Sequence, residues 1–125
     1  MVFYFCGYAV TLSTLEQLAI ARTGKTVPIF DGFEPYVAEM KRALEQPTNT
    51  LGMGFDDLFT DVRPVALPKK TPDGEAEAGV ILVRVDGDPA ERPEIFRETN
   101  GDKRVKKVVE ACFGLKIGPF LSYVL

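Results

Sequence analysis

The sequence predicts one α+β domain over residues 1–125, with a ferredoxin-like βαββαβ order and two helices in an extended first crossover. Two apolar runs and one amphipathic segment support this prediction. Residues 2–12 and 79–85 are almost uncharged and rich in β-branched and aromatic side chains, which is typical of strands buried on both faces. Residues 100–114 have a strong helical periodicity instead. The ferredoxin-like order makes the first and third strands central, and the two most apolar runs fall there.

The first strand, residues 2–12, contains Gly7, which indicates a bulge or a close backbone approach. Ser13 and Glu16 have the spacing of a capping box, in which each side chain satisfies a free donor at the start of a helix. Gly24 is placed to end that helix in a left-handed conformation. The buried face of the helix is expected at Leu15, Leu18 and Ala19.

A second helix is expected to begin near Asp31 and Glu34 and to stop before Pro47. Residues 26–30, ahead of it, fit either a short strand or an extended connector. Residues 48–59 show no clear period and are expected to be irregular. The stripe that defines the second helix consists of Phe33, Tyr36, Val37, Met40 and Leu44.

Residues 61–67 alternate as an edge strand would, because Pro64 cannot donate to a ladder in the middle of a sheet. A hairpin loop over residues 68–78 connects it to the central run 79–85. The last helix is expected to start at residues 100–102 and to end at Gly114, and an uncharged strand follows at 120–125. The inner face of that helix is expected at Val105, Val108, Val109, Cys112 and Phe113.

The composition is that of a folded globular domain, with 46% hydrophobic and 26% charged residues. A formal charge of −3 disfavours nucleic acid and anionic membranes as principal partners. No stretch approaches the roughly 18 apolar residues of a membrane span, and no basic region precedes the first apolar run as in a secretory signal. Cys6 and Cys112 lie within apolar patterns and are expected to be buried free thiols, which favours a reducing, cytoplasmic environment.

Histidine is absent, which removes the commonest general base and metal ligand. A Ser-His-Asp or Cys-His centre is therefore excluded within one chain, and two cysteines are too few for a Cys-type zinc site. Residues 24–26, Gly-Lys-Thr, copy the end of a phosphate-binding loop, but Ala19 stands where that motif needs glycine and the segment follows a helix. No cofactor is predicted.

The remaining motifs are better explained by structure than by binding. Two acidic groups could attract a hard cation, yet neither has an EF-hand spacing, and Pro89 favours a solvated turn. Tyr4 and Tyr8 could stack on RNA bases, but residues 79–85 supply no aromatic partner. The basic face of the last helix is expected to be solvated rather than phosphate-binding. The acidic groups are Asp86, Asp88 and Glu91, and Asp56, Asp57 and Asp61; the basic face is Lys103, Arg104, Lys106 and Lys107.

These exclusions favour a non-catalytic protein-binding module of the inhibitor, immunity or assembly type. The alternative is a small ligand-binding protein or enzyme that uses carboxylate, Tyr or Lys chemistry, since carboxylates alone can perform acid and base steps. Its pocket is expected at the irregular segment, near Gly52, Met53, Gly54, Asp56 and Asp57.

The final strand predicts an interaction surface. It is apolar, carries no charge, and would lie at a sheet edge, where free backbone groups are normally protected. Pairing with an unidentified protein partner, or with the same edge in a homodimer, would protect this strand. Residues 48–59 would protect it equally well if they packed over the strand. The residues of this predicted surface are Phe120, Leu121, Tyr123 and Leu125.

Overall fold

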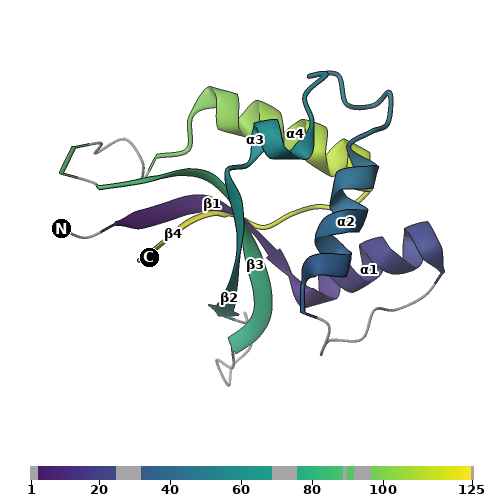
Figure 1. Ribbon diagram of the computed structural model, residues 1–125, viewed down its shortest axis with the longest axis horizontal. Coiled ribbons are helices and arrows are strands. Elements are labelled where there is room, and N and C mark those ends of the chain that lie inside the picture. Colours follow the sequence, from purple (N-terminus) through teal and green to yellow (C-terminus); the bar gives the residue numbers. More distant parts are fainter. Residues whose placement is uncertain (1–2, 25–31, 69–75, 89, 92–96, 125) are drawn as a thin grey trace.

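The core of the fold is an antiparallel sheet of four strands in the order β2-β3-β1-β4 (Figure 1). The computed structural model describes residues 3–24, 32–68, 76–88, 90–91 and 97–124 of the 125. The two most apolar strands, β1 and β3, are central, and β2 and β4 form the edges. The strands are β1 (Tyr4–Thr11), β2 (Asp61–Pro68), β3 (Ala76–Gly87) and β4 (Phe120–Val124).

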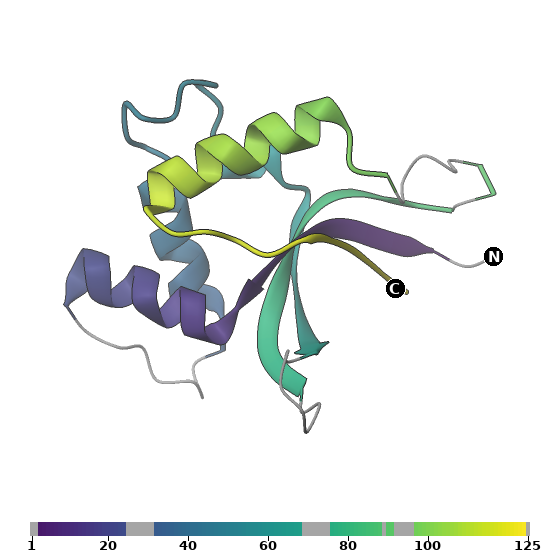
Figure 2. The same cartoon turned by 180° about the vertical axis from the view of Figure 1, so that it is seen from behind.

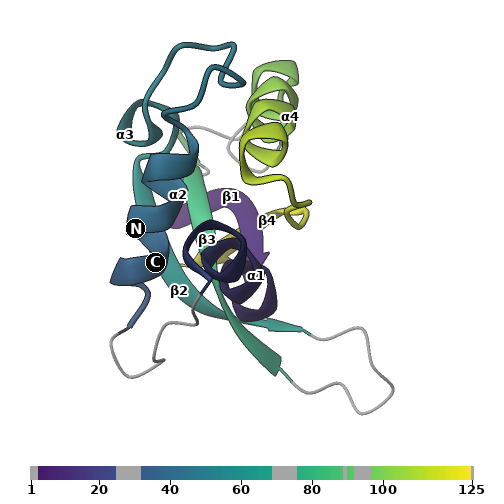
Figure 3. The same ribbon diagram turned by 90° about the vertical axis from the view of Figure 1, so that its right-hand side faces the viewer.

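The helices cover one face of this sheet (Figure 3). Together with residues from the inner face of the strands they enclose the main hydrophobic core, which includes Tyr8, Val80 and Leu82 from β1 and β3. Burial of such apolar surface is the main force that holds the two layers together. Within the described residues the helices are α1 (Leu12–Thr23), α2 (Glu34–Ala43), α3 (Phe55–Leu58) and α4 (Asn100–Phe113).

The other face of the sheet has its own small core, formed by strand residues. Tyr123 of β4 reaches across this face, and its hydroxyl donates a hydrogen bond to the Ala66 carbonyl of β2, 3.4 Å away. In a flat sheet these edges would lie about 14 Å apart, since strands are spaced by about 4.8 Å. The sheet therefore curls toward this side, which we call the outer face. Its buried residues are Phe5, Ala9, Leu67, Ile81 and Val83.

An irregularity in the central pair redirects a charged side chain. The register between β1 and β3 shifts at Cys6 and Gly7, so that Arg84 is an extra residue on β3. A side chain at position 7 could not be accommodated, because a Cβ there would lie 1.9 Å from the Leu82 carbonyl oxygen. The close approach expected at Gly7 is confirmed. The bulge turns Arg84 toward the helices, as bulges commonly do for functional or structural side chains.

The start of α1 differs from the prediction. Its N-cap is Thr11, whose hydroxyl accepts a hydrogen bond from the Thr14 backbone at 3.2 Å. Ser13 lies inside the helix and donates to Glu77 at 2.6 Å, so the predicted capping box with Glu16 is wrong. The threonine two residues earlier supplies an equivalent oxygen, which sequence spacing alone did not distinguish. The buried face at Leu15, Leu18 and Ala19 is confirmed, and Gly24 ends the helix with φ +74°.

The first crossover contains a further helix in the part of the chain that was expected to be irregular. α2 follows the predicted stripe, with Tyr36 and Met40 buried. The four-residue helix α3 follows, and Phe55 and Leu58 anchor it in the main core. The crossover therefore has three helices within the described residues rather than two. Asp31 and the 26–30 connector lie outside them.

The second half of the chain follows the prediction closely. β3 begins at Ala76 rather than at residue 79, because its first residues pair with β2 beyond the end of β1. α4 begins at Asn100 behind a Thr99 cap, and Gly114 ends it with φ +69°. The inner stripe of α4 is buried as predicted. The turn at residues 72–74 lies outside the described residues.

Candidate functional site

The side chains of β4 are partly used within the fold. Phe120 packs edge-on against Tyr8 on the helix side, with ring centroids 5.5 Å apart. Tyr123 stacks on Phe5 on the outer face, with centroids 5.7 Å apart. These two members of the predicted surface are therefore half-buried, and they fix the strand against β1 rather than projecting freely.

The accessible apolar residue of this strand is one that the prediction left out. Val124 is 60% exposed, whereas Leu121 packs partly against the outer core. Leu125, also predicted, lies outside the described residues. Alternation along the strand places Val124 on the same face as Phe120 and Ser122, but its exposure depends on the packing of the strand against β1 and is not visible in the sequence.

No other described strand pairs with the outer edge of β4, where half of its backbone groups are directed. The Ala9 amide donates to the Pro119 carbonyl at 3.2 Å, and the Gly118 amide donates to the Ala9 carbonyl at 2.7 Å. Since backbone groups in an antiparallel pair alternate in direction, residues 121 and 123 face β1. Phe120, Ser122 and Val124 therefore direct their N–H and C=O groups away from the sheet. Figure 2 shows β4 in yellow, with no other drawn helix or strand in front of it.

The opposite edge, β2, is protected. The Val62 amide donates to the Asp61 carboxylate at 2.8 Å, and Pro64 has no amide hydrogen. The Ala66 carbonyl accepts the Tyr123 hydroxyl. Arg63 adds a charge and lies over the Phe5 ring at 5.8 Å. Prolines, charges and occupied backbone groups are the usual protection against strand addition, and within the described strands β2 has them and β4 does not.

Ser122 lies in the middle of β4. The buried thiol of Cys6 donates to its hydroxyl at 3.1 Å. Burial raises the pKa of the Cys6 thiol, and the hydrogen bond to Ser122 offsets part of that effect. Both cysteines are buried and unpaired, as predicted. Because the thiol supplies the hydrogen, the Ser122 hydroxyl keeps its own proton for another acceptor.

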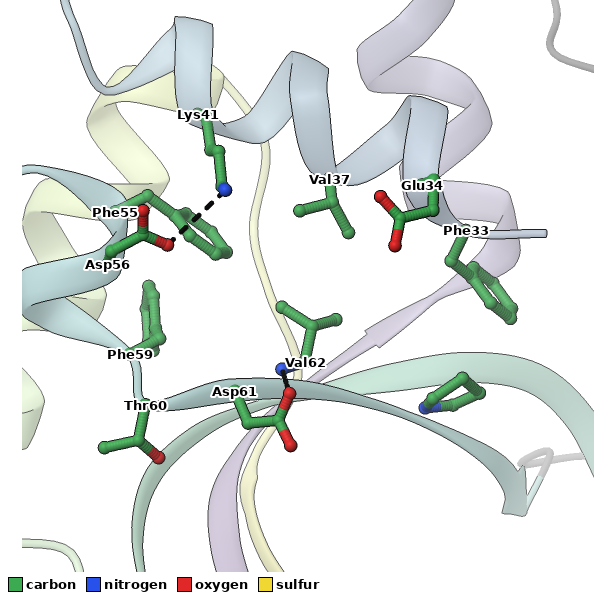
Figure 4. Close-up of a pocket in the computed structure, with 11 residues that line it drawn as sticks. Phe33, Glu34, Val37, Lys41, Phe55, Asp56, Phe59, Thr60, Asp61 and Val62 are labelled. Atoms are coloured by element: carbon green, nitrogen blue, oxygen red, sulfur yellow. Dashed lines mark hydrogen bonds and ion pairs between the residues drawn. The ribbon is translucent and has the colours of Figure 1, made fainter. Parts of the chain in front are cut away.

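The second candidate site is an open depression of about 400 Å³ between α2, α3 and β2. Figure 4 shows Val37 of α2 and Val62 of β2 facing each other across it, with Phe55 and Phe59 at one end. Of the residues predicted for a pocket, Asp56 lines this depression. A neighbouring hollow of about 390 Å³ is lined by Gly54, Asp56 and Asp57, and neither hollow is lined by Gly52 or Met53.

Charged groups surround the depression. Lys41 lies 3.4 Å from Asp56, and Asp61 lies 2.9 Å from Arg63. These side chains are between 43% and 83% exposed, so their ion pairs are weak. Glu34 also extends into the depression (Figure 4). The apolar floor and acidic rim could hold a small amphipathic molecule.

A partly buried polar cluster lies between the sheet and α4. The hydroxyl of Tyr8, a fully buried residue, donates to Glu98, and the Lys106 ammonium lies 5.5 Å from the centre of the Tyr8 ring. Arg84 forms an ion pair with Asp102 at 2.8 Å. None of these five residues lines the depression. The cluster therefore connects the helix layer to the sheet, and its ionisable groups already have partners.

The surroundings shift two pKa values in this cluster. Burial, followed by the hydrogen bond and the charge of Glu98, raises the pKa of Tyr8 far above its ordinary range, which keeps the phenol protonated. Burial also acts to raise the pKa of Asp102. Hydrogen bonds from the Thr99 backbone, from Arg84 and from the Thr99 hydroxyl outweigh it, so the pKa of Asp102 lies below its ordinary value.

The other motifs are explained by local structure. Gly24 ends α1, while Lys25 and Thr26 lie outside the described residues. Asp88 accepts the Ala90 amide at 2.9 Å in a turn, and no three His, Cys, Asp or Glu residues are grouped for a metal within the described part of the chain. Tyr8 is too deeply buried to stack on a base. No described helix is long and apolar enough to cross a membrane.

Comparison of the chain with protein-family models, with curated proteins and with solved structures found no match.

Proposed function

We propose that this chain is a non-catalytic protein-binding module of the inhibitor, immunity or assembly type, and that the β4 edge is its binding element. The contrast between the two sheet edges carries the proposal. β2 is protected by Pro64, by charge and by occupied backbone groups, whereas the outward backbone groups of β4, beside exposed Val124, pair with no strand of the described residues. An extended segment of a protein partner can add to such an edge through main-chain hydrogen bonds.

The finer fold assignment and the compartment belong to the same proposal. The strand order, with antiparallel neighbours throughout, supports a ferredoxin-like topology made of two interleaved β-α-β units. The buried, unpaired thiols Cys6 and Cys112 support a reducing, cytoplasmic environment.

The test compares two lysine variants, one at each edge. Val124→Lys places a charge on the β4 edge, and Ala66→Lys places the same charge at an exposed alanine of β2. Each variant and the wild type are used for affinity capture from native lysate, with mass spectrometry of the bound proteins. We expect a set of proteins retained by wild type and Ala66→Lys and lost with Val124→Lys. Equal capture by all three would contradict a binding role for β4.

The alternative function, a small ligand-binding protein or enzyme, is supported by the depression between α2, α3 and β2. Its apolar floor and the excess of carboxylates around it favour a small molecule with an apolar body and a positive charge. Analysis of small molecules in the same captured samples discriminates the two functions. This alternative would be favoured if a small molecule is captured by the wild type and by Val124→Lys but is lost with Val37→Glu.

A further inference from the structure

From the order of residues along β4, we infer that the strand that adds to this edge is β4 of a second copy, antiparallel and centred on Ser122. This inference rests on the proposed function, because it takes the same edge and names the partner. It also fixes the register of the pair.

The backbone geometry allows a two-fold pair. Phe120, Ser122 and Val124 direct their N–H and C=O groups outward, as the pairing of β4 with β1 requires. In an antiparallel pair centred on Ser122, Phe120 lies opposite Val124 of the second copy, and Ser122 lies opposite its own counterpart. Each outward amide then meets an outward carbonyl. The two sheets would continue into one through a self-complementary contact, as two-fold symmetry requires.

The side chains match in the same register. On the helix side, Phe120 lies opposite the partner's Val124, which covers the most exposed apolar residue of the strand. On the outer face, Leu121 lies opposite the partner's Tyr123. Aromatic rings beside aliphatic side chains are favourable cross-strand pairs. Residues 120–124 contain no charge that the pairing would bury.

Ser122 specifies the register. Its hydroxyl accepts a hydrogen bond from the Cys6 thiol and retains a proton, which the Ser122 hydroxyl of the second copy can accept. A shift of two residues would place this hydroxyl opposite Phe120 or Val124. The hydroxyl would keep its bond from Cys6, but its proton would have no side-chain acceptor on the facing strand, and a buried donor left unsatisfied is costly. A polar residue at the centre of an apolar contact therefore selects one alignment.

The experiment measures mass by sedimentation equilibrium at micromolar concentration. We expect the wild type to be a dimer. Ser122→Lys and Ser122→Glu should each be at least about tenfold weaker in association, because like charges would lie opposite each other at the two-fold axis. An equimolar mixture of the two variants should recover the dimer, since lysine then lies opposite glutamate. This recovery is specific to the inferred register, because residue 122 faces residue 122 in that register alone.

Circular dichroism and the thermal midpoint of each variant confirm that the fold is retained. If a charge at position 122 disturbs the Cys6 contact and lowers the midpoint, Val124→Lys carries the same expectation of a monomer. A monomeric wild type would overturn the second copy as partner, and charged variants that remain dimeric would overturn the contact at β4. Neither result removes the proposed function, because edge-dependent capture of another protein tests that separately.

Discussion

Arg84 connects three parts of the fold. The bulge at Cys6 and Gly7 makes it an extra residue on β3 and turns it toward the helices. There it forms an ion pair with Asp102 at the start of α4 and donates to the Leu58 carbonyl at the end of α3. One long side chain thus supplies the opposite charge for a buried carboxylate and a hydrogen bond to a helix-end carbonyl.

Removal of this arginine should therefore be costly. Arg84→Met is expected to destabilise the protein by about 3 kcal/mol, because Asp102 would remain buried without a positive charge to balance it. The matched control is Arg63→Met. The side chains of Arg63 and Asp61 are 43% and 49% exposed, so the loss of their ion pair should cost less than about 1 kcal/mol. Urea denaturation of both variants measures the difference. Equal losses of stability would show that Arg84 has no special structural role.

Asp102 gives the stability a pH dependence. Its folded-state pKa lies below the ordinary value of about 3.9, so between those two pKa values the folded state binds fewer protons than the unfolded state. The stability contributed by this carboxylate is therefore complete above about pH 4 and is lost as the pH falls through the folded pKa.

Unfolding free energies between pH 2 and pH 5, read from urea titrations, measure this effect. The loss on acidification should be smaller in Asp102→Asn than in the wild type. Asp86→Asn, a change at an exposed carboxylate, should retain the wild-type slope. An unchanged slope in Asp102→Asn would contradict the assignment.

At the scale of single elements, α4 is the helix whose faces are most clearly separated. Val109, in the middle of its inner stripe, is completely buried, and Lys107 lies on the solvated side. Val109→Ala should cost about 1–3 kcal/mol, since it leaves a cavity, and Lys107→Ala should change the stability by less than about 0.5 kcal/mol. Lys106→Ala should fall between them, because its ammonium lies over the Tyr8 ring at a contact usually worth about 0.5–1 kcal/mol. The free energies of unfolding in urea should follow this order, and a reversed order would mean that the faces are misassigned.

Helices and strands with a strong periodicity could be predicted from the sequence. The inner faces of α2 and α4 and the central position of β3 followed from apolar spacing, because burial imposes that spacing. The cap of α1 and the helix α3 could not be predicted in this way. Thr11 and Ser13 both offer a hydroxyl at a plausible position, and a four-residue helix is too short to show a period.

For the candidate sites, too, local features could be predicted from the sequence, whereas features that depend on long-range packing could not. The uncharged character of β4 is visible in the sequence, but the fraction of Val124 that stays exposed depends on how Phe120 and Tyr123 pack against β1. Asp56, one of the residues predicted for a pocket, lines the depression. The wall opposite it comes from α2 and β2, which are distant in sequence, so local patterns could not reveal the depression.

At the scale of the whole molecule, the curled sheet separates two cores. The helices cover the inner face, and on the outer face the two edge strands approach each other through Tyr123 and Ala66. This curling protects the outer face, whose small core contains no residue of the described helices. It leaves the β4 edge as the place where the sheet can be extended.

The central claim is that a strand adds to this edge, and residue-resolved amide exchange tests it most directly. Exchange is measured by NMR at low and at high protein concentration. The amides of Phe120, Ser122 and Val124, which face outward, should gain protection as concentration rises, while those of Leu121 and Tyr123 should be protected by β1 at both concentrations. The claim would be contradicted if these three outward amides still exchanged rapidly at high protein concentration and also in the presence of any captured partner.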